Sequence, residues 1–207
     1  MRIIVTGGAG FIGTNLIKEL VKNEHHEVAS IDNYNTGLKS NEQSGCVYYN
    51  GDVSEIKDFG LTSDVPDLIF HIGARARIQP SFKDPQASFE ANVLGTQNVL
   101  EYARLRNIPV IYAASSSSHG DVHANPYTFT KWQAEELIMH WVKIYNLPAN
   151  SLRFFNAYGA RSRTSGAYGA VFGVFLAQKL AGKPLTIVGN GEQTRDFIHV
   201  DDLVRAI

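Results

Sequence analysis

A glycine-rich turn near the start of the chain constrains the fold more than any other feature. Residues 7–13 read Gly-Gly-Ala-Gly-Phe-Ile-Gly, between a β-branched run at 2–5 and apolar residues at helical spacing at 14–21. The glycines therefore lie between a predicted buried strand and a predicted helix. Such a turn lets a pyrophosphate approach backbone N–H groups and the positive end of the helix dipole. We predict a dinucleotide-binding unit, and the alternative is a tight turn that binds nothing.

An acidic residue after the second predicted strand supports the dinucleotide interpretation. The strand at 27–31 leads directly into Asp32, close to the distance from the glycines at which a carboxylate meets the adenosine ribose hydroxyls. A carboxylate there repels a 2′-phosphate, so NAD is favoured over NADP. The alternative role for Asp32 is a cap or turn residue. Asp52, after a third strand at 47–49, could accept a hydrogen bond from an adenine amino group or could cap a helix.

Strands alternate with helices along the rest of the chain. Further strands are predicted at 67–71 and 110–114, so the pattern indicates an α/β fold with a doubly wound parallel sheet. Gly73-Ala74 leave room for a cofactor at the carboxyl end of the fourth strand. A helix is expected from about 85 to 104, with Asn92 toward the cofactor side. Its core candidates are Phe89, Val93, Val99 and Leu100.

A tyrosine and a lysine lie one turn apart on the next predicted helix, which begins at Pro126 with Asn125 as N-cap. Tyr127 and Lys131 therefore share one helix face. An unperturbed tyrosine, with a pKa of ~10, acts poorly as a base at pH 7. Each unit by which its pKa is lowered requires about 1.4 kcal/mol of preferential stabilisation of the phenolate. We expect Lys131 and a nearby nicotinamide cation to lower the pKa of Tyr127. Ser115, after the fifth strand, could link it to a substrate hydroxyl. The alternative is a chance pair on an amphipathic helix.

The overall composition excludes several functional classes. The net charge is −1 and the basic residues are scattered, so no nucleic-acid partner is expected. No apolar run reaches the ~18 residues of a membrane span, and no metal site is expected. The single cysteine, Cys46, suits a reducing cytosol and rules out an internal disulfide framework.

Taken together, these motifs resemble the extended short-chain dehydrogenase/reductases, within them the NAD-dependent sugar-nucleotide epimerase/dehydratase family, and most of all its UDP-glucose/UDP-galactose 4-epimerases. The similarity runs from residue 6 to residue 202. It implies a Rossmann NAD-binding domain over 1–156 and a partial substrate-binding region over 157–207, because family members usually continue further. It also implies a cytoplasmic homodimer formed through two helices, with Trp132, Ile138 and Trp141 as apolar candidates. The loop at 121–126 is shorter than is usual in the family, so the resemblance does not identify the sugar of the substrate.

The resemblance also assigns residue roles by position. The catalytic residues it implies are Ser115, Tyr127 and Lys131. The cofactor-binding residues it implies are Gly7, Gly10, Phe11, Ile12, Gly13, Asp32, Asn33, Asn35, Thr36, Asp52, Val53, Gly73, Ala74, Arg75, Asn92, Ala113, Tyr127, Lys131 and Phe155. The substrate residues it implies are Arg77, Ser115, Ser116, Ser117, Asn156, Val171, Phe172, Thr186, Val188 and Arg195.

The implied reaction inverts C4 of a UDP-sugar through a 4-keto intermediate. The enzyme alternative is a sugar-nucleotide 4,6-dehydratase or decarboxylase. Those relatives typically place an acidic residue just after the catalytic serine or threonine, where this chain has Ser116 and Ser117. A second alternative is a non-catalytic NAD-binding protein on the same fold, against which the intact Tyr127 and Lys131 argue.

Overall fold

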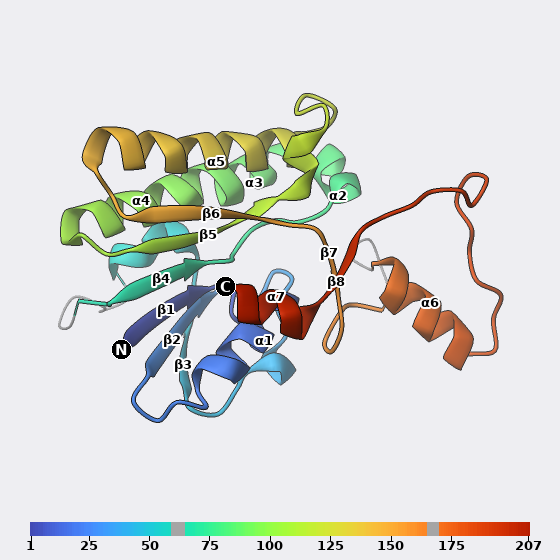
Figure 1. The fold of residues 1–207 in the computed structure, drawn as a ribbon, viewed down its shortest axis with the longest axis horizontal. Helices are drawn as coiled ribbons and strands as arrows, with labels where there is room; N and C mark the ends of the chain where they lie inside the picture. Colours follow the sequence, from blue (N-terminus) through green and yellow to red (C-terminus); the bar gives the residue numbers. More distant parts are fainter. Residues whose placement is uncertain (59–64, 165–169) are drawn as a thin grey trace.

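Six parallel strands form the centre of the molecule. The structure is a computed structural model that describes residues 1–58, 65–164 and 170–207. The strand order is β3-β2-β1-β4-β5-β6 (Figure 1). Strands after β1 are first added on one side of it and then, from β4 on, on its other side. This order confirms the predicted doubly wound parallel sheet, whose ligands bind at the carboxyl edge where the order reverses. The strands are β1 (Arg2–Thr6), β2 (Glu27–Asp32), β3 (Cys46–Asn50), β4 (Leu68–His71), β5 (Val110–Ser115) and β6 (Ala149–Phe154).

Two layers of helices cover the two faces of this sheet. Side chains alternate between the faces along each strand, so Ile3 and Val5 of β1 pack against one layer and Ile4 packs against the other. The first layer holds α1 (Phe11–Leu20) and α7 (Val200–Ala206). The second holds α4 (Gly95–Arg106) and α5 (Pro126–Tyr145). Among the described residues, no helix is long and apolar enough to cross a membrane.

The single helix expected from 85 to 104 is divided into three pieces. They are α3 (Pro85–Phe89), the π turn η3 (Glu90–Leu94) and α4. A π turn contains one extra residue and changes which residues face the core. Phe89 is consequently 39% exposed, so its assignment to the core is wrong, whereas Asn92 is only 1% exposed. The other three core candidates are buried, namely Val93, Val99 and Leu100.

Helix α5 begins where its sequence predicts, and it ends at a left-handed asparagine. The Asn125 side chain accepts a hydrogen bond from the N–H of Thr128, and Asn146 ends the helix in the left-handed region with a φ of 55°. Ile138 is 1% exposed and belongs to the core of this chain. It is therefore not available for the expected contact between subunits, and the homodimer stays a prediction.

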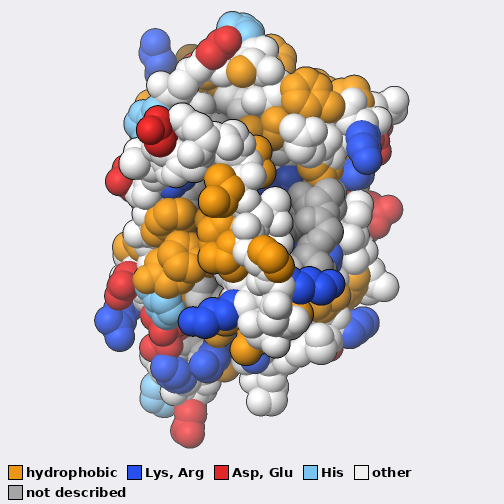
Figure 2. All heavy atoms as spheres, turned by 90° about the vertical axis from the view of Figure 1, so that its right-hand side faces the viewer, with side chains coloured by type: hydrophobic (Ala, Val, Ile, Leu, Met, Phe, Trp, Pro, Cys, Tyr) orange, Lys and Arg blue, Asp and Glu red, His pale blue; other side chains and the backbone are white. Residues whose placement is uncertain are grey.

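A second, two-stranded parallel sheet follows the main one, formed by β7 (Asn156–Tyr158) and β8 (Phe197–His199). Between these strands, α6 (Val171–Leu180) and the segment after it project away from the main body (Figure 1). We call residues 170–196 the arm. Hydrophobic side chains gather on this side of the molecule (Figure 2). The remaining short helices are η1 (Lys39–Asn41), η2 (Val53–Asp58), α2 (Ile78–Lys83) and η4 (Ser116–His119).

Packing at the start of α1 yields a first prediction. A Cβ added to Gly13 would overlap the carbonyl oxygen of Gly7 and lie 2.8 Å from the Cα of Gly8. Gly13→Ala should therefore destabilise the fold by about 1–3 kcal/mol, the usual cost of overpacking. Urea denaturation measures the change. At Gly120 an added Cβ has its nearest neighbour at 3.7 Å, so Gly120→Ala should stay within about 0.5 kcal/mol of the wild type. Equal losses in the two variants would contradict this account.

Candidate active site

The glycine turn lies at the carboxyl end of β1, where it meets the end of β4. A Cβ added to Gly7 would lie 2.7 Å from the Cα of Gly73, so the two strand ends approach this closely only because both positions lack side chains. A Cβ on Gly10 would meet only the Gly7 carbonyl, at 3.1 Å, and would otherwise point into open space. Gly10 is the N-cap of α1 and offers no side-chain acceptor to the first turn. This open cradle of backbone N–H groups fits a pyrophosphate.

Asp32 braces the same turn from the end of β2. It is 8% exposed, and its carboxylate accepts hydrogen bonds from the N–H groups of Ala9, at 2.9 Å, and Tyr34, at 2.8 Å. Burial raises the pKa of Asp32, and the two N–H groups oppose that rise. The turn role and the ribose role are therefore compatible, because the carboxylate is placed beside the cradle by the turn that it braces.

The other adenosine-side residues form a small polar cluster. Asn33 donates to Asp52 at 2.8 Å, and Asp52 also accepts from the N–H of Ser54 at 2.9 Å. Asp52 thus fulfils the capping alternative, and its adenine contact stays a prediction. Asn35 donates its N–H to the Asn33 side chain, and the Thr36 carbonyl accepts from Arg163.

A buried histidine joins the ends of β1 and β4 to the helix layer. Thr6 Oγ1 and His71 Nδ1 are 2.7 Å apart, and His71 Nε2 lies 3.0 Å from Thr96 Oγ1. Thr96 donates to the Asn92 carbonyl, and Thr6 accepts from the N–H of Gly73. Only the His71 tautomer with the proton on Nε2 satisfies every one of these bonds, an assignment made from the network. Burial lowers the pKa of His71 to about 3, so the ring is neutral.

Asn92 continues this chain of hydrogen bonds to α5. Its amide accepts from the N–H of Arg75 at 2.8 Å and donates to the Arg75 carbonyl and to Thr130 Oγ1, at 3.2 and 3.0 Å. The side chain is therefore occupied by protein partners. We interpret Asn92 as positioning Arg75 and α5 rather than as contacting the cofactor itself.

The predicted catalytic hydroxyl groups are brought together. The Tyr127 phenol donates to Ser115 Oγ at 3.3 Å, and Ser115 Oγ lies 2.8 Å from Ser117 Oγ. Ser81, which is 1% exposed, accepts from the N–H of Tyr127 at 3.0 Å and donates to the Ile78 carbonyl at 2.7 Å. Ser81 thus ties α2 to the start of α5. An isolated serine forms no recognisable pattern, so the sequence did not predict this role of Ser81.

Lys131 takes an orientation that the sequence did not predict. It is 4% exposed, donates to the Ala113 carbonyl at 2.6 Å and lies 4.3 Å from the centre of the Tyr112 ring. Burial lowers the pKa of Lys131 to about 7, and Glu135 partly opposes this. Burial raises the pKa of Tyr127, and the groups that oppose this rise are Ser115 and Arg77 rather than Lys131. The expected help from Lys131 is thus absent here, because its amine points to a main-chain carbonyl and is only partly charged at neutral pH.

Glu135 supports Lys131 from the next turn of α5. It is 8% exposed and accepts two hydrogen bonds from Arg153 Nε, at 3.0 and 3.1 Å, and one from Ser151 at 2.9 Å. The sequence analysis missed this residue. Its spacing could have identified it, because Tyr127, Lys131 and Glu135 recur every four residues along one helix face.

The two arginines before α2 differ in their environment. Arg75 pairs with Asp84, with Nη1 and Oδ2 3.6 Å apart. Arg77 is exposed and has backbone angles φ 95° and ψ 136°. The other non-glycine residues with positive φ among those described have φ between 53° and 68°. A strained backbone of this kind costs about 1–3 kcal/mol and persists only where its surroundings hold it.

The predicted substrate residues are not all brought to Tyr127. Ser116 and Ser117 lie in η4, directly after β5. Phe155, which is predicted to bind the cofactor, is 44% exposed, with its ring centre 5.8 Å from that of His119. Asn156 donates to the Asp196 carbonyl and so joins β7 to β8. The arm, which projects away from the sheet edge (Figure 1), carries the remaining members, namely Val171, Phe172, Thr186, Val188 and Arg195.

Among these arm residues, Phe172 packs against the β7–β8 strands, whereas Thr186 and Arg195 bond within the arm. Phe172 stacks on Tyr158 with ring centres 4.4 Å apart and meets Phe197 edge-on at 4.7 Å. Thr186 bonds to the Gln178 side chain, and Arg195 bonds to the carbonyl of its neighbour, Thr194. In the described part of the chain, no group of three or more His, Cys, Asp or Glu side chains could hold a metal ion.

Comparison with known proteins adds independent findings. The family model described as "NAD dependent epimerase/dehydratase family" matches residues 3–207. A putative UDP-glucose 4-epimerase of Methanocaldococcus jannaschii is 33% identical over 99% of this chain and 71% of that protein. UDP-glucuronic acid decarboxylase 6 of Arabidopsis thaliana is 33% identical over 100% of this chain and 65% of that protein. The crystal structure of a UDP-glucose 4-epimerase of Thermotoga maritima, solved with UDP-glucose, matches with a TM-score of 0.93 at 28% identity, over 100% of this chain and 72% of that one.

The buried amine of Lys131 generates a second prediction. Because its pKa falls from 10.5 to about 7 on folding, the unfolded chain binds more protons between these pH values, so stability rises with pH through this window. Lys131→Met should therefore stabilise the fold by a few kcal/mol, roughly, at pH 6 and by much less at pH 10.5. Thermal unfolding at both pH values measures the gain. Lys143→Met, an exposed change on the same helix, should show no such pH dependence. A Lys131→Met gain that did not vary with pH would refute the burial argument.

Proposed function

Because the chain belongs to the NAD-dependent epimerase/dehydratase family, we propose that it inverts C4 of a nucleotide sugar of the UDP-glucose/UDP-galactose type. The observation that carries the proposal is the Tyr127–Ser115 hydrogen bond of 3.3 Å at the carboxyl end of β5. This pair lies on the sheet edge that also holds the glycine cradle between β1 and β4. The relatives act on neutral and on acidic sugars by their names, which leaves the sugar to be identified.

The cofactor of this family is NAD, and the open cradle fits it. We propose that the turn and α1 hold its pyrophosphate and that Asp32 meets the adenosine ribose. Phe155, exposed beside η4, would line the nicotinamide side. When bound, this cofactor supplies reversible hydride acceptance.

In the proposed reaction Tyr127 handles the proton of the sugar 4-hydroxyl. Ser115 accepts the Tyr127 phenol hydrogen in the structure, and its own hydroxyl can bond the sugar oxygen at the same time. Removal of the 4-hydroxyl proton alone would leave an alkoxide, so a 4-keto sugar forms only as C4 also gives up a hydride, which bound NAD would accept. Return of that hydride to the opposite face of C4, together with return of the proton from Tyr127, would complete the inverted product. Since burial raises the pKa of Tyr127, proton removal needs additional positive charge at the site. A bound nicotinamide cation and Arg77 are the two candidates on this side of α5.

The decarboxylase and dehydratase alternative receives less support. The positions directly after Ser115 are hydroxyl groups, and Ser117 donates its N–H to Ser115 and so shapes η4. The two positions where those relatives typically place a carboxylate are Ser116 and Ser117 in this chain. Glu135 is the buried carboxylate nearest along α5, and Arg153 and Ser151 already occupy it.

Loss of the phenol hydroxyl tests the reaction. Tyr127→Phe should lower kcat for 4-epimer interconversion by about 10² to 10⁴, the usual range for a lost general acid–base. Binding of NAD should remain, because the cradle is untouched. The assay follows UDP-glucose and UDP-galactose without net consumption of added NAD.

The control for this variant lies on the outer surface of the same helix. Met139→Leu changes an exposed side chain and should leave kcat unchanged. Accumulation of a 4-keto-6-deoxy sugar would replace the epimerase proposal by the dehydratase. Binding of both ligands with no product from any UDP-sugar would favour the non-catalytic alternative.

Asp32 generates a prediction about the choice of cofactor. A carboxylate braced beside the cradle repels the 2′-phosphate of NADP, so NAD should bind at least about tenfold more tightly. Isothermal titration with each dinucleotide measures the ratio. Asp32→Asn should narrow the ratio without reversing it, since a 2′-phosphate also needs a cation. Tighter binding of NADP by the wild type would refute the assignment of Asp32.

A further inference from the structure

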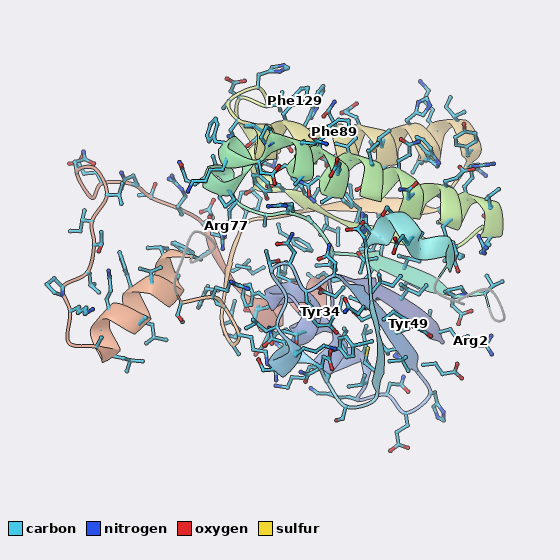
Figure 3. All side chains as sticks on the ribbon, turned by 180° about the vertical axis from the view of Figure 1, so that it is seen from behind. Arg2, Tyr34, Tyr49, Arg77, Phe89 and Phe129 are labelled. Atoms are coloured by element: carbon cyan, nitrogen blue, oxygen red, sulfur yellow. The ribbon has the colours of Figure 1, made fainter. Side chains whose placement is uncertain are left out.

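Arg77 is an exposed cation in the turn before α2, near enough to the proposed catalytic tyrosine to influence it. Its backbone is continuous with Ile78, whose carbonyl accepts from Ser81, and Ser81 in turn accepts from the N–H of Tyr127. The strained turn at Arg77 is thus anchored to the start of α5. Figure 3 shows Arg77 between α2 and the β7–β8 strands. Its charge is felt at Tyr127.

The surroundings of Arg77 leave its charge uncompensated. Within the described ranges, no carboxylate lies within ion-pair distance of its guanidinium, although Arg75, two residues earlier, pairs with Asp84. Two charged side chains on the neighbouring face of α5 already have partners. Lys131 bonds to a main-chain carbonyl, and Glu135 is held by Arg153.

A bound anion would supply the missing partner. A guanidinium presents a planar fork of donors that matches a carboxylate, and it keeps its charge at any physiological pH. Arg77 directly precedes Ile78, whose carbonyl is bonded to the serine that holds the N–H of Tyr127, the residue proposed to act on C4. In a hexose the C6 group is attached to C5, the neighbour of C4, so a substrate with its 4-hydroxyl at Tyr127 holds its C6 group close to the same position.

We propose that Arg77 selects nucleotide sugars that carry a carboxylate at C6, so that the preferred substrates are nucleotide uronic acids rather than neutral hexoses. The inference rests on the proposed function, because it uses Tyr127 to place C4. It makes Arg77 a specificity-determining residue. The strained backbone at Arg77 would then be retained because it directs the guanidinium into the site.

Binding measurements with three probes test this inference. Isothermal titration in the presence of NAD compares UDP-glucuronic acid, UDP-glucose and UDP. The wild type should bind UDP-glucuronic acid about tenfold or more tightly than UDP-glucose. Arg77→Gln should abolish that preference and leave the Kd for UDP unchanged. Arg205→Gln, an exposed arginine of α7 paired with Asp202, is the matched control and should alter none of the three affinities.

A second variant separates the charge from the backbone. Arg77→Gly removes the cation at a φ of 95°, which glycine adopts without strain, so the variant should lose the preference while its Tm rises. Equal wild-type affinities for the two sugars would overturn the inference. The inference would also be overturned if Arg77→Gln weakened the binding of UDP as much as that of UDP-glucuronic acid, because Arg77 would then contact the diphosphate.

Turnover distinguishes this inference from the proposed function. Interconversion of UDP-glucose and UDP-galactose in preference to the uronic acids would overturn the role of Arg77 and leave the 4-epimerase standing. If UDP-glucuronic acid bound in an Arg77-dependent way but gave CO₂ or no product, the role of Arg77 would stand and the 4-epimerase proposal would be overturned. A 4-epimer of UDP-glucuronic acid, formed by the wild type and lost selectively in Arg77→Gln, would support both.

Discussion

The relation between the glycine turn and α5 depends on one buried chain of hydrogen bonds, which runs from Thr6 through His71, Thr96 and Asn92 to Thr130. Each of these side chains is at most 3% exposed. A broken link would leave a polar group unsatisfied in the core, at a cost of about 1–3 kcal/mol. Because both ring nitrogens of His71 are occupied, the chain has one arrangement of donors and acceptors. This uniqueness fixes the distance from the cofactor cradle to the tyrosine of α5.

The buried amine of Lys131 has a pKa close to neutral pH. Lys131 lies beneath β5, where burial opposes its charge and the Glu135–Arg153 pair only partly restores it. Tyr127, one turn earlier, is shifted the other way by the same burial. These opposite shifts move the two pKa values apart, and each of them favours the uncharged form of its group. Tyr127 and Lys131 are therefore not held as a permanent ion pair, and a proton can be moved at this face of α5.

Much of this architecture could be predicted from local sequence patterns. The glycine turn, the acid at the end of β2 and the capped start of α5 are each encoded within a few residues, so spacing alone identifies them. Phe89 was misassigned because nothing in its sequence marks the π turn that follows it. The orientation of Lys131 and the bracing role of Ser81 depend on how α5 packs against β5 and α2, which involves residues distant in sequence. The arm bonds mainly to itself, so its relation to the site follows from neither pattern nor packing.

The π turn at η3 has a consequence for the gene as well as for the protein. An ordinary α-helix advances 100° per residue, so the extra residue of a π turn offsets everything after it by about that angle. An in-frame deletion of one codon between Glu90 and Leu94 would restore a regular helix at almost no cost to its length. It would also carry the Asn92 amide off Arg75 and Thr130, or turn the apolar face of α4 away from the sheet. The extra residue of the π turn is therefore retained because Asn92 has partners before and after this helix. Insertions and deletions should be tolerated only at the two ends of the helix.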